Sequence, residues 1–179
     1  QNALIYLLAV NAVVFIVLGF LKVLYLLNDS TVEAFEADIL FKTGVPARIG
    51  SFTAQAWGVV LYMFSHGGFL EILTNMLWLW CFGYILRDLA GNSRIIPVYL
   101  YGGLVGAIFF LAVVNGIPAF RSNINSYYPL LGAKPAIMAV AIAATYLEPR
   151  YKILQRIAGG IPLWALRYVF FILTYGTSL

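Results

Sequence analysis

Glu71, Asn75, His66 and Lys134 are the residues of this chain whose types and positions could carry chemistry. Glu71 and Asn75 are four residues apart within an apolar stretch, so a helix would present both on one face. His66 precedes that stretch, and Lys134 lies in a second, shorter apolar stretch. Polar groups inside membrane-spanning helices are costly and usually face the interior of the bundle. An amine, a carboxylate, an amide and an imidazole gathered there could exchange protons, attack a carbonyl group or form ion pairs.

Each of these residues also has a purely structural interpretation. Asn75 could hydrogen-bond to a neighbouring helix, and Lys134 and Glu71 could each reach the membrane interface separately. A lone histidine such as His66 is more often a hydrogen-bonded helix-end residue than a metal ligand. Cys81, the one cysteine, lies in an apolar segment as a small hydrophobic residue, which excludes an intrachain disulfide framework and a multi-cysteine metal site. We therefore expect no cofactor.

The composition of the chain is that of a membrane protein. Of 179 residues, 63% are hydrophobic and 10% are charged, whereas a soluble domain carries about 25% charged residues. Such a chain cannot cover a water-facing surface with its own polar groups, so we expect it to contact a lipid bilayer. The net charge is +4 and the basic residues are scattered. Nucleic-acid binding needs a clustered basic face, so we expect no nucleic-acid partner.

Five apolar blocks predict an all-α polytopic membrane protein. A helix needs roughly 20 residues to cross the hydrocarbon core of a bilayer. The blocks run over about 3–27, 67–86, 95–117, 130–147 and from 163 onward. The fifth block contains Arg167 and is short of a full crossing after that residue, and Gln1 precedes the first block without a basic flank. We therefore expect residues 1–179 to form a single membrane domain, truncated before or within the fifth or sixth helix.

Loop charges predict the orientation of the chain. Basic residues gather in the connections after the second and fourth blocks: Arg87, Arg94, Arg150, Lys152 and Arg156. We expect these connections and the amino terminus to be cytoplasmic. The long first loop, 28–56, is acidic and would face outward. It could lie in the membrane interface through its apolar runs or form an ordinary surface loop.

Several separated segments resemble signatures of the rhomboid intramembrane proteases. The stretch that leads into the second block follows the family's H-x-x-x-x-H-x-x-x-N pattern, with His66 and Asn75 retained. The run 132–135, Gly-Ala-Lys-Pro, matches the G-x-S-x active-site segment. Trp57 matches the tryptophan of the first-loop signature, although Gly58 stands where an arginine normally follows. With a glycine-rich third block between them, the resemblance covers essentially the whole chain.

This resemblance implies a rhomboid-like helical bundle of six core helices, about five of them in this chain, around a water-filled cavity. In the family, a serine at the start of the fourth helix attacks the peptide bond and a histidine on the sixth helix is the general base. The serine amide, a histidine and an asparagine stabilise the oxyanion. Carried over, the serine position is Lys134, the oxyanion histidine is Glu71, the asparagine is Asn75 and the leading histidine is His66.

The replacements at Lys134 and Glu71 predict that this chain is a pseudoprotease and not an enzyme. An amine nucleophile would form a stable amide, so turnover would stop. A carboxylate at position 71 would place negative charge where the oxyanion develops. We therefore expect a binding or scaffolding subunit that recognises transmembrane partner or client helices, using the small-residue face of Gly102, Gly103 and Gly106. The family pattern and the short loops favour a bacterial inner membrane.

Two other functions stay open at this point. Lys134 could be the base or nucleophile of an intramembrane peptidase with altered chemistry. No serine is near it in sequence, since Ser122 and Ser126 belong to the preceding loop and Ser178 to the end of the chain. A transporter is a third alternative, but such folds typically contain a repeated pair of broken helices, and the sequence shows none.

If the family's backbone is retained, Lys134 and Glu71 face one cavity and should form a buried ion pair, because an unpaired buried charge is strongly disfavoured. A pair predicts that Glu71→Gln destabilises the protein and that adding Lys134→Met largely restores it. Thermal unfolding of both variants measures this, and a double variant no more stable than the single one contradicts the pair.

Overall fold

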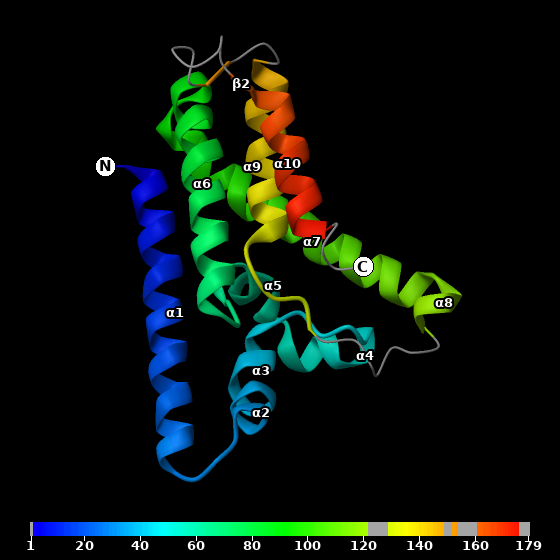
Figure 1. The fold of residues 1–179 in the computed structure, drawn as a ribbon. Helices are drawn as coiled ribbons and strands as arrows, with labels where there is room; N and C mark the ends of the chain where they lie inside the picture. Colours follow the sequence, from blue (N-terminus) through cyan, green and yellow to red (C-terminus); the bar gives the residue numbers. More distant parts are fainter. Residues whose placement is uncertain (1, 122–128, 149–151, 154–160, 176–179) are drawn as a thin grey trace.

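Each of the five apolar blocks forms a helix, and the helices assemble into a bundle. The structure is a computed structural model that describes residues 2–121, 129–148, 152–153 and 161–175 (Figure 1). The helices are α1 (Ala3–Leu27), α6 (Phe69–Ala90), α7 (Ile95–Gly116), α9 (Lys134–Leu147) and α10 (Leu163–Tyr175). Three segments, α1, α6 and α7 with the turn before it, are long and apolar enough to cross a membrane, whereas α9 and α10 are shorter. The predicted all-α, rhomboid-like membrane bundle is confirmed.

Helix α9 occupies the centre of the bundle. It packs against α6, α7 and α10, and Figure 1 shows it between α6 and α10 with α7 crossing behind. Its buried positions are mostly small or β-branched: Ala136, Ile137, Val140, Ala141, Ala144 and Thr145. Small side chains let neighbouring backbones approach closely, which is how helices associate where lipid removes the hydrophobic driving force.

Three glycines of α7 provide the closest of these approaches. A β-carbon added to each would clash with a neighbour: Gly102 with Ala139, Gly106 with Pro135, and Gly103 with Met63. Ala139 and Pro135 belong to α9, and Met63 belongs to η3 (Tyr62–Phe64). These glycines therefore pack helices of this chain against each other. Gly102 and Gly106 also line a cavity of about 650 Å³ between α7 and α9, so the expectation that they contact a partner helix stays a prediction.

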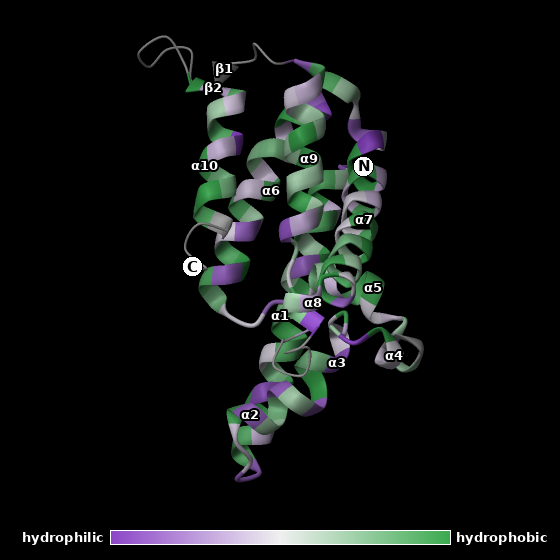
Figure 2. Cartoon of the chain, turned by 90° about the vertical axis from the view of Figure 1, so that its right-hand side faces the viewer, coloured by the Kyte–Doolittle hydropathy of each residue, from purple (hydrophilic) through white to green (hydrophobic). Residues whose placement is uncertain are grey.

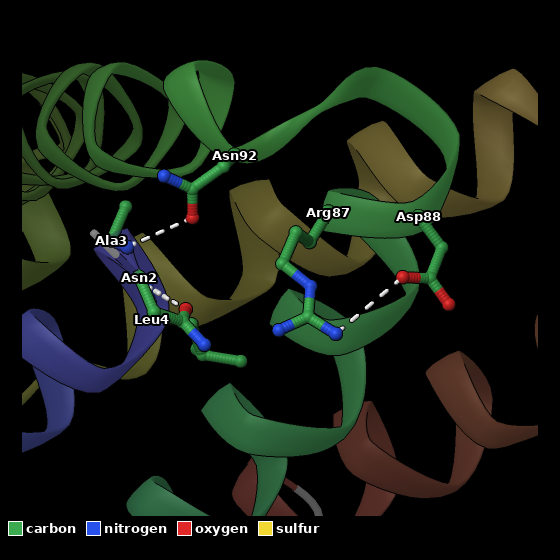
Figure 3. Close-up of polar contacts among 6 residues, drawn as sticks. All are labelled: Asn2, Ala3, Leu4, Arg87, Asp88 and Asn92. Atoms are coloured by element: carbon green, nitrogen blue, oxygen red, sulfur yellow. Dashed lines mark hydrogen bonds and ion pairs between the residues drawn. The ribbon is translucent and has the colours of Figure 1, made fainter.

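The amino end of α1 is held at one end of the bundle by two asparagines (Figure 3). Asn2 Oδ1 accepts the Leu4 N–H at 3.2 Å, and Asn92 Oδ1 accepts the Ala3 N–H at 2.8 Å. The first N–H groups of a helix have no partner within it, so both side chains cap α1. Because Asn92 belongs to η4 (Asn92–Arg94), this cap also ties α1 to the turn between α6 and α7.

The long first loop folds into a series of short helices. In chain order they are α2 (Val32–Phe35), η1 (Glu36–Leu40), α3 (Phe41–Thr43), α4 (Ile49–Phe52), η2 (Thr53–Gln55) and α5 (Gly58–Leu61). Phe35 and Leu40 are buried against Leu18 of α1. Val45 and Leu130 exchange backbone hydrogen bonds of 3.1 and 2.9 Å. The loop is thus fixed both to α1 and to the segment that leads into α9.

The connections sort to two ends of the bundle, in agreement with the predicted parity of the helices. The start of α1, the α6–α7 turn and the strand pair β1 (Lys152–Ile153) and β2 (Ile161–Pro162) lie at the upper end of Figure 1. The first-loop helices and α8 (Pro118–Arg121) lie at the lower end. Figure 2 shows hydrophilic residues on α2 and near the upper turn, with mostly hydrophobic helices between. Arg150 and Arg156, two of the basic residues used for orientation, lie outside the described residues.

Because α7 and α9 approach closely at Gly102, we expect the stability of the protein to fall when a single methyl group is added there. Gly102→Ala should destabilise the protein by about 1–3 kcal/mol, because the added β-carbon meets the β-carbon of Ala139, which cannot rotate away. Gly116→Ala, at the end of the same helix with nothing within 4 Å, is the matched control and should be neutral or slightly stabilising. Thermal unfolding in mild detergent measures both. Equal stability of the two variants would contradict the close packing.

Candidate functional site

Glu71 folds back onto the start of its own helix. The N-cap of α6 is Gly68, which has no side chain to accept the N–H groups of the first turn. Glu71 is the third residue of the helix, and its Oε2 accepts the Gly67 N–H at 3.0 Å. This arrangement resembles the acidic half of a capping box, and a carboxylate in the first turn is stabilised by the helix dipole. Glu71 therefore has a structural function at the start of α6.

The other carboxylate oxygen of Glu71 lies against Gly132, in the segment before α9. A β-carbon on Gly132 would be 2.5 Å from Glu71 Oε1 and 3.7 Å from Asn75 Nδ2. Gly132 also has φ of +92°, a conformation that other residues rarely adopt. Its N–H donates to the Tyr62 carbonyl at 2.9 Å. Glycine is thus required at position 132 both for space and for backbone conformation.

Lys134 is the first residue of α9. Ala133 is the N-cap, and Pro135 follows in the first turn, where a proline loses no N–H that the helix needs. The fourth helix therefore begins four residues later than the apolar block that starts at Leu130. A cation at a helix N-terminus is unfavourable with respect to the helix dipole. The stability of α9 therefore does not explain why a lysine is present at position 134.

Glu71, Asn75 and Lys134 line one cavity of about 370 Å³ between α6, α9 and α10. The remaining lining residues are Leu70, Thr74, Trp78 and Leu173. The structure thus brings together the three residues that the sequence placed at degenerate active-site positions. We call this space the Lys134 cavity. His66 does not line it and faces a different cavity.

The ion pair expected between Lys134 and Glu71 is not formed. Across the described residues the structure contains one salt bridge, between Arg87 and Asp88 at 3.6 Å (Figure 3). The reason is that one oxygen of Glu71 accepts the Gly67 N–H while the other lies against Gly132. The two charges share the Lys134 cavity without direct contact.

Two buried polar atoms near the start of α6 lack hydrogen-bond partners in the described part of the chain: Asn75 Nδ2 and His66 Nε2. Both residues are 2% exposed. His66 Nδ1 lies 3.2 Å from the Phe64 carbonyl, so Nδ1 carries the proton, because a carbonyl only accepts. Burial lowers the pKa of His66, Glu71 and the Phe64 contact raise it, and Lys134 lowers it further. The imidazole is therefore a hydrogen-bonded residue before the helix, with Nε2 as a free acceptor in its neutral form.

Thr74 is a lining residue that the sequence did not single out. It is the one hydroxyl-bearing side chain among the described residues of the Lys134 cavity. Its hydroxyl lies 2.8 Å from the Leu70 carbonyl and 3.0 Å from the Glu71 carbonyl. The proton is therefore directed to the backbone of α6 and away from the Lys134 amine. Its position three residues after Glu71, on the same helix face, is the signal that could have revealed it.

Trp57 and Gly58 belong to the packing of the first loop. The Trp57 indole N–H donates to the Lys42 carbonyl at 2.9 Å. Gly58 is buried, and a β-carbon there would clash with the Gly44 carbonyl oxygen. This close backbone approach leaves no room for a side chain at position 58.

Two tyrosines that sequence reasoning missed hold the cavity's surroundings in place. The Tyr62 hydroxyl donates to the Gly103 carbonyl at 2.6 Å, and the Tyr99 hydroxyl donates to the Met63 carbonyl at 2.8 Å. Both side chains are fully buried. The sequence does not reveal these hydrogen bonds, because each hydroxyl donates to a backbone carbonyl of a distant segment and no residue type marks that partner.

Comparison with known proteins is consistent with this geometry. The Rhomboid domain model matches residues 53–179. "Rhomboid protein 1, mitochondrial" of Saccharomyces cerevisiae is 34% identical over 91 residues, which cover 51% of this chain and 25% of that protein. "Presenilin-associated rhomboid-like protein A, mitochondrial" of Danio rerio is 30% identical over 95 residues, covering 53% and 23%. "RHOMBOID-like protein 5" of Arabidopsis thaliana is 27% identical over 88 residues, covering 49% and 28%.

The matched stretch therefore spans about a quarter of the length of each relative. No solved structure matches the chain. The names of two relatives place those proteins in mitochondria, and the third is a plant protein. These names do not support the bacterial inner membrane expected from the sequence.

The separate positions of Glu71 and Lys134 change the expected outcome of the double substitution. Glu71→Ala should destabilise the protein by about 1 kcal/mol, since it removes the acceptor of the Gly67 N–H. Glu71→Gln is the matched control, because its amide oxygen can still accept that N–H. Without direct contact, the effects of Glu71→Gln and Lys134→Met should add to within about 0.5 kcal/mol. Chemical unfolding of the four variants measures this, and a rescue by Lys134→Met would favour the ion pair instead.

Proposed function

The chain belongs to the rhomboid family, and we propose that it is a catalytically inactive member that binds a transmembrane helix of a partner protein. The observation that carries this proposal is the Lys134 cavity. Lys134 occupies the position of the serine nucleophile, and Glu71 occupies that of an oxyanion-stabilising histidine. The described lining offers Thr74 as its hydroxyl, and that proton points to backbone carbonyls. Acyl transfer needs an activated nucleophile beside a base, and this arrangement does not supply one.

The cavity nevertheless keeps features suited to recognition of a helix or an unwound segment. Leu70 on α6 and Leu173 on α10 lie at its apolar edge and are 74% and 56% exposed. Inside, the unpartnered Asn75 amide offers a hydrogen bond to a carbonyl oxygen. We place partner contact at this edge, between α6 and α10. The face of Gly102 and Gly106, which line a cavity between α7 and α9, stays a second candidate contact.

The membrane is a separate part of the proposal. The chain is an integral membrane protein, and the relatives' names favour an organelle of a eukaryotic cell, such as the mitochondrion, over a bacterial inner membrane. Loop charge favours a topology in which the amino terminus and the turn that carries Arg87 and Arg94 face the same compartment. In a mitochondrial membrane this compartment would be the matrix instead of the cytoplasm.

An intramembrane peptidase with altered chemistry is the alternative, and one observation favours it. Thr74 and Lys134 line the same cavity, so a threonine hydroxyl and an amine base are present together. Rotation of Thr74 about its χ1 bond would break its contacts with the Leu70 and Glu71 carbonyls. The activity assay below separates the two functions.

Proteolysis is tested with purified protein in lipid vesicles that contain a fluorescent transmembrane reporter. The chain should leave the reporter intact. Lys134→Ser should also be inactive, because Glu71 still places a carboxylate beside Gly132 where negative charge would develop. Cleavage by the unsubstituted chain that disappears in both Thr74→Val and Lys134→Met would establish the peptidase and overturn the inactive assignment.

Partner binding is tested by site-specific photocrosslinking in the native membrane. A photoreactive residue at Leu70, at the cavity edge, should give one reproducible adduct with a membrane protein, identified by mass spectrometry. Ile16 on α1, which is 66% exposed, is the matched lipid-facing control and should give none. Adducts of equal yield at both positions, or adducts with lipid alone, would contradict a partner site between α6 and α10.

A further inference from the structure

A second cavity, of about 170 Å³, lies between α1, the first-loop helices and the start of α6. Its apolar walls are Phe15, Leu18, Phe35, Leu40 and Phe69. Its polar groups come from Lys22, His66 and the backbone of Gly67 and Gly68, and Gly19 completes the lining. We call it the His66 cavity. His66 is part of a family signature, but the proposed function does not use this cavity.

The His66 side chain presents an unused acceptor to this cavity. The residue is 2% exposed, and Nε2 has no hydrogen-bond partner. Because Nδ1–H donates to the Phe64 carbonyl at 3.2 Å, neutral Nε2 carries a lone pair and no proton. An unpaired buried acceptor costs free energy, so a ligand that donates one hydrogen bond here would be favoured.

The other polar groups of the cavity are donors. Gly68, the N-cap of α6, has no side chain to accept the first-turn N–H groups, and Glu71 accepts the Gly67 N–H that precedes the helix. Helix N-termini bind anions through their free N–H groups and dipole. Lys22 adds an ammonium group from α1 and makes no salt bridge in the part of the chain that the structure describes.

Among the described residues that line the cavity, none is acidic. Glu71 is on α6, but its Oε2 accepts the Gly67 N–H and its Oε1 lies against Gly132. Glu33 on α2 is exposed, and its pKa is lowered mainly by hydrogen bonds to backbone and to Thr31, with a smaller effect of Lys22. Burial lowers the pKa of His66, the Glu71 charge raises it and the Lys134 charge lowers it. The cavity therefore combines one acceptor, His66 Nε2, with one ammonium group, Lys22, and backbone N–H donors.

We propose that the His66 cavity binds a phosphate monoester group. The negatively charged phosphoryl oxygens would accept hydrogen bonds from Lys22 and from the first-turn N–H groups of α6. The remaining phosphoryl hydroxyl would donate to His66 Nε2. A phosphodiester has no such hydroxyl, and a carboxylate has no third oxygen. A phosphate monoester has one hydroxyl donor for His66 Nε2 and several oxygen acceptors for the N–H groups. The cavity should therefore bind a monoester in preference to a phosphodiester or a carboxylate.

Two sources share this chemistry, namely free phosphate compounds and the headgroup of phosphatidic acid. Lys22 lies near the end of α1, beside the first-loop helices, where a spanning helix approaches the lipid headgroups. The apolar walls would accept the glycerol end of a lipid. The experiment therefore uses both inorganic phosphate and phosphatidic acid as probes.

The chain contains one histidine, so a ¹⁵N-histidine-labelled sample gives a direct reading of His66. The protein in phosphatidylcholine nanodiscs is titrated with inorganic phosphate and, separately, with phosphatidic acid. Binding should shift the Nε2 resonance toward its protonated position. Phosphatidylglycerol, an anionic phosphodiester, should bind at least tenfold more weakly. A response to both probes identifies phosphate as sufficient, and a response to phosphatidic acid alone identifies the lipid headgroup; either supports the site.

Two variants test the location of the site. Lys22→Met should weaken binding at least tenfold. Gly19→Leu should abolish it by filling the cavity, since nothing lies within 4 Å of a β-carbon at that position. Val17→Leu, on an exposed position of the same helix, should bind as the unsubstituted chain does. No shift with either probe, equal binding of phosphatidylglycerol, or unchanged binding in both Lys22→Met and Gly19→Leu would overturn the proposal.

Discussion

The contact between α7 and α9 sets the position of the helix that begins at Lys134. α9 can lie at the centre only because Gly102 and Gly106 leave space for Ala139 and Pro135. With α9 in that position, the segment before it is held over α6 by the hydrogen bond from Gly132 to Tyr62. This packing places Lys134 in the same cavity as Glu71 and Asn75, independently of the function of the cavity. Close packing of small residues is thus a precondition of the site as well as of the fold.

Hydrogen bonds inside the apolar interior fix the first loop to this core. Tyr62 and Tyr99 each donate to a backbone carbonyl, at Gly103 and Met63 respectively. A hydrogen bond in such surroundings is strong, and its loss leaves a buried polar group unpaired. These two bonds cross between η3 and α7, so the loop and the helix keep one relative position. The start of α6 follows directly from η3, which links the loop to Glu71.

The helices could be predicted from the sequence because apolar length decides them, and the block 3–27 matches α1 residue for residue. The cavity could also be predicted, since the spacing of Glu71, Asn75 and Lys134 follows a family pattern. The absent ion pair was not predicted, because Glu71 accepts the Gly67 N–H, a local contact at the start of α6 that competes with Lys134. The neighbours that the α7 glycines contact could not be predicted either. A stripe of small residues signals close packing but does not identify the neighbour that packs there.

The hydrogen bonds of Asn11 have a consequence for the assembly of the protein in the membrane. Its Nδ2 donates to the Leu7 carbonyl at 2.8 Å and lies 3.4 Å from the Tyr99 hydroxyl, which is 88 residues later in the chain. At about 5–20 residues per second, synthesis reaches Tyr99 roughly 4–18 s after Asn11. During this delay the Asn11 amide lacks its partner on α7. The hydrogen bond to the Leu7 carbonyl within α1 lowers the free-energy cost of holding the Asn11 amide in hydrocarbon. Helix α1 can therefore stay in the bilayer until α7 is inserted and packs against it.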